Sequence, residues 1–299
     1  MRVLYPEHRP HSHPAFCLFI HSPSLPSRLR ATPPEFHSPP FSLFSFLPSY
    51  LPSFSPSPQP RPLFMPNSLA RQATIVIPVY GSLDHLQKCL ASLLAWHHIP
   101  ILLVDDGNPP GTLQHFASMP GLKIIRQPHR GITHAWNTGI AAVRTPCVIL
   151  LNSDVITTGP WINQLLAPLQ KPASPSLPPI QLTGAAWQSP TASASVGMPA
   201  QSLLAGWCLA FRKSLWHHLG HFDERFRHWF SDTDFQQRLL AASSAHHSSP
   251  GPIRCLNTLP LSHALHASTR HLPARSQLYA LDRTAYFQKW QLEGHRPCT

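Results

Sequence analysis

Hydrophobic and polar positions form two kinds of block along most of the chain. From residue 73 onward, short runs of consecutive apolar residues alternate with segments whose apolar residues lie three or four positions apart. Continuous apolar runs are typical of strands buried on both faces, and the wider spacing is typical of amphipathic helices. The expected strands are Ala73–Val79, Ile101–Val104, Leu122–Arg126 and Cys147–Leu151, and the expected helices are Asp84–Trp96, Thr112–Ser118 and Ile132–Val143.

This alternation predicts an α/β fold with a doubly wound, mostly parallel sheet of the Rossmann-like kind. Right-handed crossovers place the carboxyl ends of such strands at one edge of the sheet, where ligands bind. Residues 168–200, rich in Pro, Ser and Ala, are interpreted as a long, loosely structured connection. Regular structure is expected to resume at Ser202–Phe211, with helices over Arg212–Leu219, Phe235–Ala242 and Ser276–Trp290.

The first 70 residues have a different composition. They hold 16 of the 36 prolines, together with many Ser, Phe and His residues. This density of Pro blocks helices and ladder hydrogen bonds, and no single apolar region is followed by a signal-peptide cleavage site. We interpret residues 1–70 as disordered, or as not part of the natural protein, with Met65 as the alternative start. Residues 71–299 are then one catalytic domain.

Composition restricts the class of partner. The chain has 299 residues, of which 42% are hydrophobic, and 23 Lys+Arg against 12 Asp+Glu give a net charge of +11. A basic balance suits partners that carry phosphate, although a bias of the genome towards Arg would produce it too. Because no basic run is interleaved with aromatic residues, we expect no nucleic-acid partner. No apolar stretch reaches the roughly 18 residues that a membrane span needs.

Carboxylates are scarce and concentrated. Only 10 acidic residues follow position 70, and six of them are aspartates in three short motifs: Asp105, Asp106, Asp154, Asp223, Asp232 and Asp234. The first motif is Asp105-Asp106-Gly107, directly after an expected strand, where the acids either bind a base or ribose or form an ordinary turn. The second is Asn152-Ser153-Asp154, after another strand, where Asp154 either binds a divalent metal or caps a helix.

The third motif combines acids with aromatic residues, in the segments 222–226 and 229–235. Aromatic surroundings can raise the pKa of a carboxylate towards the working range of a general base, although the same acids would also suit a helix N-terminus. Asp232 and Asp234 are two positions apart and cannot project in the same direction. One is expected to face the cleft, and the other to cap the helix or pair with Arg238.

Eight motifs in order resemble the inverting family 2 glycosyltransferases with the GT-A fold, in their rhamnosyltransferase-like branch. The resemblance covers residues 73 to about 240, and more weakly to 290. The motifs are IVIPVYG, LxxCLxSL, VDDG, RGxxxAxNxGI, LLNSD, AGWCLAFRKSL, LGxFDERF and SDTDFxxR.

The resemblance implies a role for each matched residue. Asp232 corresponds to the general base, Asp154 to the last acid of the metal-binding D-x-D motif, and Gly206 and Trp207 to the acceptor side. His263 and His266 fall where the family often places a metal-binding His. The residues implied to bind the nucleotide sugar are Pro78, Val79, Tyr80, Asp105, Asp106, Arg130, Gly131, Asn137, Ser153 and Asp154.

Three positions depart from the family pattern. Asn152 stands at the first acid of D-x-D, His129 stands where Asn is usual, and Ser231 replaces the Glu beside the base. These departures keep an alternative open: a catalytically weakened module that binds a nucleotide sugar or a glycan. A transferase that forms a pyrophosphate bond is disfavoured, because the loop after the first strand lacks Gly-x-Gly and basic residues.

The expected function is therefore metal-dependent, inverting transfer of a sugar from a nucleotide diphosphate sugar to an acceptor hydroxyl in surface polysaccharide or glycan synthesis. The expected cofactor is a divalent cation, Mn²⁺ or Mg²⁺. The acceptor is expected to be a glycan or a lipid-linked molecule. A cytoplasmic location is expected, and peripheral association with the inner face of the membrane stays open.

Overall fold

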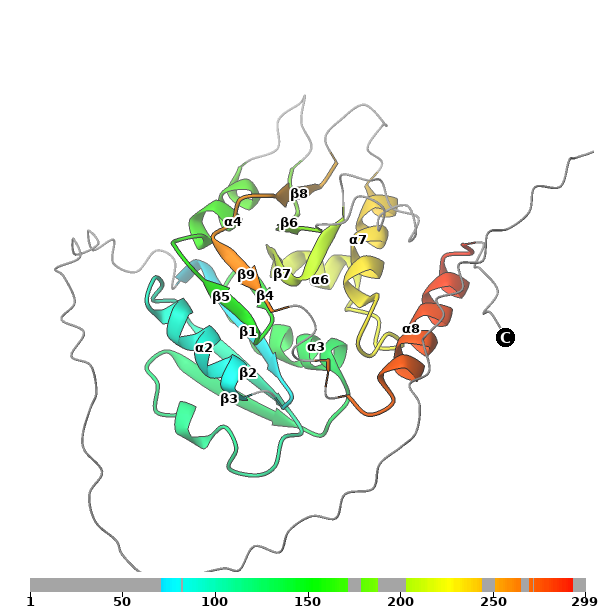
Figure 1. Cartoon of the computed structure of the whole chain (residues 1–299). Helices are drawn as coiled ribbons and strands as arrows, with labels where there is room; N and C mark the ends of the chain where they lie inside the picture. The colour runs from blue at the N-terminus through cyan, green and yellow to red at the C-terminus, as the bar shows by residue number, and fades with distance from the viewer. Residues whose placement is uncertain are drawn as a thin grey trace, which may run out of the picture. The chain divides into compact units, whose positions relative to one another are not determined.

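The computed structural model describes residues 71–81, 83–171, 179–187, 203–243, 251–264, 269–270 and 272–292. These residues form a seven-stranded sheet in the order β3-β2-β1-β4-β7-β6-β8 and a two-stranded sheet of β5 and β9 (Figure 1). The strands are β1 (Ala73–Val79), β2 (Ile101–Asp106), β3 (Leu122–Gln127), β4 (Cys147–Leu151), β5 (Val155–Thr157), β6 (Leu182–Ala186), β7 (Leu204–Arg212), β8 (Ile253–Leu256) and β9 (Leu261–His263).

The first half of the large sheet is parallel. β1 pairs with β2 and β4, and β2 pairs with β3, all in parallel register. All residues of β1, β2 and β4 are buried, which is the reason for their uninterrupted apolar sequences. β7 then joins β4 in antiparallel register, and β6 pairs with β7 and β8. The expected α/β sheet, mostly parallel, is confirmed.

Helices cover both faces of the large sheet (Figure 1). The side chains of alternate strand residues point to opposite faces, so Ile75 and Ile77 pack into one apolar cluster and Val76 into the other. The first cluster includes α2 (Leu83–Leu94) and α4 (Ile162–Gln170). The second includes α3 (Ile132–Ala142), α6 (Lys213–Leu219) and α7 (Ser231–Ala242). The last helix is α8 (Arg275–Lys289).

Several predicted elements need correction. The helix expected over Thr112–Ser118 is a single 3₁₀ turn, Gln114–Phe116. The expected loose connection at 168–200 contains β6 and the end of α4, while residues 172–178 and 188–200 lie outside the described part. β6 reads Leu-Thr-Gly-Ala-Ala, which has weak strand propensity, and it is a strand because β7 and β8 pair with it on either side.

Two further expectations concern the ends of the chain and the membrane. The prediction of disorder for residues 1–70, and with it Met65, lies outside the described residues. Within the described residues, no helix combines the length and apolar character required to cross a bilayer.

Candidate active site

A cleft opens where the parallel strands end. It is bounded by the segments that follow β1, β2 and β4, by the start of α3, and by two segments from later in the chain. Its lining residues are Pro78, Val79, Tyr80, Asp106, His129, Ile132, Asn152, Ser153, His228, Thr269 and Leu272. The sheet edge predicted to bind a ligand is therefore the edge that carries the cleft.

Asp105 stabilises the loop that follows β1. Its Oδ1 accepts hydrogen bonds from the backbone N and the Nδ2 of Asn108, at 2.9 and 2.7 Å. Asn108 in turn accepts a hydrogen bond from the backbone N of Gly81 and donates one to the carbonyl of Val79. The buried Asp105 carboxylate is thus balanced by hydrogen bonds within the protein. It lies behind the cleft, as a support for the residues that line it.

Asp106 holds the loop between β3 and α3. Its carboxylate accepts hydrogen bonds from the backbone N of Arg130 and of Gly131, at 3.0 and 2.9 Å, and from Gln127 Nε2 at 2.7 Å. His129 Nδ1 lies 2.8 Å from the second oxygen. A buried carboxylate requires such partners, and these contacts supply them for Asp106.

Two glycines permit this loop to pack closely. Gly107 has φ +91°, and a Cβ there would lie 2.6 Å from the backbone N of His129. Gly131 has φ +97°, and a Cβ there would lie 2.6 Å from the carbonyl of Arg227. Only glycine adopts these angles readily and leaves this space empty. The imidazole of His129 then stacks on Tyr80, with ring centroids 3.9 Å apart, and forms a flat aromatic wall.

Two residues expected to bind the nucleotide sugar point elsewhere. The guanidinium of Arg130 is exposed and lies 3.3 Å from Glu224. The amide of Asn137 donates to the carbonyl of Phe222 and to Glu224, and its oxygen accepts from Trp216 Nε1 and from the backbone N of Phe222. Every polar atom of the Asn137 side chain thus has a protein partner. These hydrogen bonds join α3 to the segment before α7.

Asp154 and His263 meet beside the cleft. The antiparallel pairing of β5 with β9 places His263 opposite Val155, next to Asp154. His263 Nε2 lies 3.0 Å from Oδ1 of the buried Asp154. The ring of His263 also stacks on Trp207, with centroids 5.2 Å apart. Two of the three side chains predicted to bind a metal are therefore neighbours, while His266 lies outside the described residues.

These side chains fit a divalent cation. A carboxylate and an imidazole are both common metal ligands, and two ligand atoms about 2.1 Å from one ion, at right angles, lie about 3.0 Å apart. Asn152 Oδ1 is buried and has no hydrogen-bond partner among the described residues, so it offers a further oxygen ligand. The described residues contain no group of three or more His, Cys, Asp or Glu side chains that could hold an ion.

Asp232 has the environment expected of a base. It is the second residue of α7 and is half-buried against β7. A Cβ on Gly206 would lie 2.5 Å from Asp232 Oδ2, so only glycine fits there. Burial raises the pKa of Asp232 to about 6, against the opposing effect of backbone N–H groups of Thr233, Asp232 and Gly206. At neutral pH the carboxylate is ionised and its pKa lies close to the working pH.

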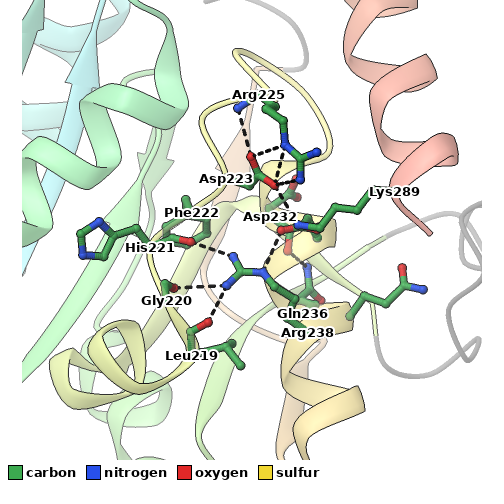
Figure 2. Close-up of polar contacts among 12 residues, drawn as sticks. Leu219, Gly220, His221, Phe222, Asp223, Arg225, Asp232, Gln236, Arg238 and Lys289 are labelled. Atoms are coloured by element: carbon green, nitrogen blue, oxygen red, sulfur yellow. Dashed lines mark hydrogen bonds and ion pairs between the residues drawn. The ribbon is translucent and has the colours of Figure 1, made fainter.

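Asp234 has a structural environment. It is completely buried, and its carboxylate contacts Arg238 Nε at 2.9 Å, Lys289 Nζ at 2.6 Å and Trp290 Nε1 at 3.0 Å. Arg238 also donates to the carbonyls of Leu219, Gly220 and His221, as Figure 2 shows. The pairing of Asp234 with Arg238 is the one expected from their spacing of four residues.

Four residues of the cleft had no role expected from the sequence: Ile132, His228, Thr269 and Leu272. None was expected either for Asp282 of α8, whose carboxylate accepts hydrogen bonds from the backbone N of Arg227, His228 and Trp229, at 3.1, 2.8 and 2.9 Å. The position of His228 between the two segments of the aromatic, acidic motif was a usable signal. Asp282 had none, because its partners lie more than 50 positions away in sequence.

Comparison with known proteins identifies the first part of this architecture. Residues 74–203 match the glycosyl transferase family 2 model. This region is a family 2 glycosyltransferase domain. The family 2 domain contains the first-strand loop, both acidic motifs at the strand ends and the segment that leads to β7.

Curated relatives share this domain over part of their length. A pre-mycofactocin glycosyltransferase of Mycobacterium tuberculosis is 32% identical over 99 residues, which are 32% of this chain and 20% of the relative. The glycosyltransferase GlyA of Streptococcus pneumoniae is 30% identical over 97 residues, 30% of this chain and 13% of the relative. The matched part of the chain thus spans a fifth or less of the length of these relatives.

A solved structure shares the fold of the glycosyltransferase domain. It is a mannosyltransferase from Pyrobaculum calidifontis in complex with GDP-Man and Mn²⁺, with a TM-score of 0.50 and 17% identity. The similarity covers 76% of this chain and 66% of the other. This share is larger than that of the family 2 match, residues 74–203. The GT-A type of architecture expected from the sequence agrees with this neighbour.

Proposed function

We propose that this chain transfers a sugar from a nucleotide diphosphate sugar to the hydroxyl of an acceptor, with inversion at the anomeric carbon. One observation carries the proposal. Two consecutive residues of β7 connect the candidate base to the candidate metal ligands: Gly206 lies against Asp232, and Trp207 stacks on His263. The proton acceptor and the site for a diphosphate are thus held by one rigid strand.

In the proposed reaction, Asp232 accepts the proton of the acceptor hydroxyl while its oxygen attacks the anomeric carbon. The bond from that carbon to the diphosphate oxygen breaks in the same displacement, so the configuration inverts. Asp232 suits this step because desolvation raises its pKa to about 6, which strengthens it as a base while leaving it ionised at neutral pH. A separate catalytic acid is unnecessary if the diphosphate leaves unprotonated.

Asp154, His263 and Asn152 are the described residues that would hold a divalent cation, with His266 as a further candidate. The ion would supply positive charge to stabilise the nucleoside diphosphate as it leaves. The mannosyltransferase with GDP-Man and Mn²⁺ supports a nucleotide sugar and a cation of this kind. Since it shares only the fold at 17% identity, we carry both over as proposals.

The base of the donor would lie against the wall of Tyr80 and His129, which lines the cleft. Gly206 and Trp207 would then border the acceptor, because they lie next to the proposed base. We propose a glycan or lipid-linked acceptor, a role in surface polysaccharide or glycan synthesis, and membership of the rhamnosyltransferase-like branch as the sequence motifs suggest.

The test is a screen of donors on the full chain. Melting temperature is measured with a panel of nucleoside diphosphates and nucleotide sugars, with Mn²⁺, Mg²⁺ or EDTA. A ligand at 100 times its Kd should stabilise the fold by about 2.7 kcal/mol, in a metal-dependent way. Release of sugar from the stabilising donor is then measured with and without candidate acceptors.

The outcomes distinguish an active transferase from a catalytically weakened binding module, the two hypotheses that Ser231 leaves open. Stabilisation by a nucleotide sugar together with sugar release supports the enzyme. Stabilisation with no turnover on any acceptor, and no hydrolysis, supports the weakened binding module. Absence of stabilisation by every nucleotide contradicts both.

A further inference from the structure

Three polar side-chain atoms of the cleft are buried without a hydrogen-bond partner among the described residues. They are Asn152 Oδ1, His228 Nε2 and Thr269 Oγ1. A buried polar atom without a partner costs free energy, so an unpaired group in a cleft indicates that a ligand completes it. Asn152 lies beside the proposed metal ligands. His228 and Thr269 come from two different segments, and neither has been given a role so far.

The acids at the end of β2 were expected to bind the base or the ribose, but their partners in the structure are protein groups. Both carboxylates are buried, Asp105 at 3% and Asp106 at 2% exposure, and both already accept hydrogen bonds from the protein. Asp105 does not line the cleft, and the two oxygens of Asp106 each already have two partners, so neither acid is free to accept a ribose hydroxyl in this arrangement. Other polar groups of the cleft are therefore candidates to bind the sugar of the nucleotide.

We propose that His228 and Thr269 hydrogen-bond the ribose hydroxyls of the nucleotide donor. This inference rests on the proposed function, because it needs a nucleotide in the cleft. It assigns a binding role to the wall formed by residues that follow the matched family 2 segment, 74–203.

The position of His228 suits the ribose. Its ring centroid lies 6.0 Å from that of His129, which forms the aromatic wall with Tyr80. Asn152 and Ser153 also line the cleft and directly precede the proposed metal ligand Asp154. In a nucleoside diphosphate the ribose joins the base to the phosphates, so a base on the aromatic wall and phosphates near Asp154 leave the ribose between them.

The chemistry of the pair favours hydroxyls over phosphate. Burial lowers the pKa of His228 to about 4, so the imidazole is neutral at neutral pH, with one nitrogen that donates and one that accepts. The hydroxyl of Thr269 also both donates and accepts. Phosphate oxygens favour charged donors, whereas a ribose hydroxyl needs partners of both kinds.

The backbone around His228 is held in place from two sides. Asp282 accepts hydrogen bonds from three consecutive backbone N–H groups, those of residues 227–229. The carbonyl of Arg227 accepts a hydrogen bond from the backbone N of Thr133 at 3.3 Å, and Gly131 leaves room for this approach. His228 is therefore presented to the cleft by a fixed backbone, as a binding group requires.

The test compares ribose with deoxyribose in one set of variants. Binding of UDP and GDP, and of their 2′-deoxy and 3′-deoxy forms, is measured by calorimetry on the full chain with Mn²⁺. The wild type should bind the ribonucleotide about tenfold more tightly than at least one deoxy form, the size of one hydrogen bond. His228→Phe should weaken the ribonucleotide about tenfold and leave that deoxy form unchanged. Thr269→Val should behave in the same way.

Two variants test the specificity of the effect. His228→Gln keeps a polar group near the position of Nε2 and should retain most of the preference for ribose. His221→Phe is the matched control, because the ring of His221 stacks on Trp216 at 3.9 Å and is not among the cleft residues. It should bind every nucleotide like the wild type.

Equal losses towards ribose and deoxyribose in His228→Phe and Thr269→Val would overturn the inference while leaving the proposed function intact. Equal binding of all sugar forms by the wild type would do the same. If no nucleotide of the donor panel binds the wild type, the proposed function fails and this inference fails with it.

Discussion

Two aspartates near the start of α7, Asp232 and Asp234, have different surroundings. Asp232 lies against Gly206 and burial raises its pKa, whereas Asp234, two residues on, contacts Arg238 and Lys289. From these surroundings we infer different roles for the two aspartates. This contrast makes each residue testable by the same Asp→Asn change.

Asp232→Asn should lower sugar transfer by 10²-fold or more, because general-base catalysis contributes about 10²–10⁴-fold. Donor affinity should change little, since the carboxylate contacts the acceptor side. Wild-type transfer should also fall as the pH drops below about 6, where Asp232 becomes protonated. Steady-state kinetics across pH, with Asp234→Asn as comparison, checks both. An active Asp232→Asn beside a stable, inactive Asp234→Asn would reverse the two roles.

The same change should stabilise the fold at neutral pH. Burial raises the pKa of Asp232 from 3.8 to about 6, so the native state binds this proton more tightly than the unfolded state does. The contribution of protonated Asp232 to the free energy of unfolding is therefore present at low pH and is lost as the pH rises through about 6. Asp232→Asn should therefore gain on the order of 1–3 kcal/mol at pH 8 and little below pH 4. Denaturant unfolding at both pH values measures this, and an equal effect at both would contradict the assigned cause.

Asp154→Asn should weaken metal-dependent binding of a nucleoside diphosphate, because it removes the carboxylate charge nearest the proposed ion. His263→Asn should have a smaller effect, since a neutral ligand is lost. Calorimetry of nucleoside diphosphate binding, with Mn²⁺ and with EDTA, measures the metal-dependent affinity of both variants. Full affinity in Asp154→Asn, with no effect of EDTA on the wild type, would remove the metal role from Asp154.

At the scale of elements, α7 and α8 form a unit through buried charges. Lys289 at the end of α8 lies 2.6 Å from Asp234 and 2.8 Å from Asp223, and Arg225 lies 2.6 Å from Asp223 (Figure 2). Hydrogen bonds and Lys289 hold the pKa of Asp223 well below its usual range, although burial opposes this shift. Because Asp232 lies in the first turn of α7, the contacts that hold α7 also orient the proposed base.

Asp234→Asn should lower stability by about 2–4 kcal/mol, because it leaves Arg238 and Lys289 without a buried anion. This exceeds the roughly 1 kcal/mol of a lost helix cap. Glu224→Gln is a matched control, since its pair with Arg130 is exposed and should contribute less than about 1 kcal/mol. Chemical denaturation of both variants gives the comparison. Equal small losses would mean that Asp234 is only a cap.

At the scale of the whole molecule, the described elements all lie within residues 71–292. We propose that residues 71–299 are one folding unit, which the Pro-rich composition of residues 1–70 supports.

A chain that begins at Met65 should fold and bind nucleotide as well as the full chain does, because the Pro-rich composition of residues 1–64 cannot bury enough apolar surface to offset the entropy of ordering. Thermal melting and calorimetry of both chains, measured side by side, check this. Loss of folding on shortening would refute the division at about residue 70.

The sequence by itself determined the parallel half of the sheet. Runs such as Ala73–Val79 are buried on both faces, so hydrophobicity alone marks them, and the acids that follow must lie at the edge. It also marked Asp105, Asp106, Asp154 and Asp232 as candidate site residues, because acids are rare in this chain and cluster where strands or helices end. The pairing of Asp234 with Arg238 followed from helical spacing, which is a local property.

Only the tertiary structure decided which distant residues meet. β6 is a strand through its neighbours, His263 reaches Asp154 through the pairing of β9 with β5, and Asp282 reaches the loop before α7 from the last helix. The hydrogen bonds that Asp106 and Asn137 make within the protein could not be predicted from the sequence either, since the partners of a side chain depend on packing. Periodicity reports the environment along one segment, whereas contacts between segments depend on how the whole sheet and its helices close together.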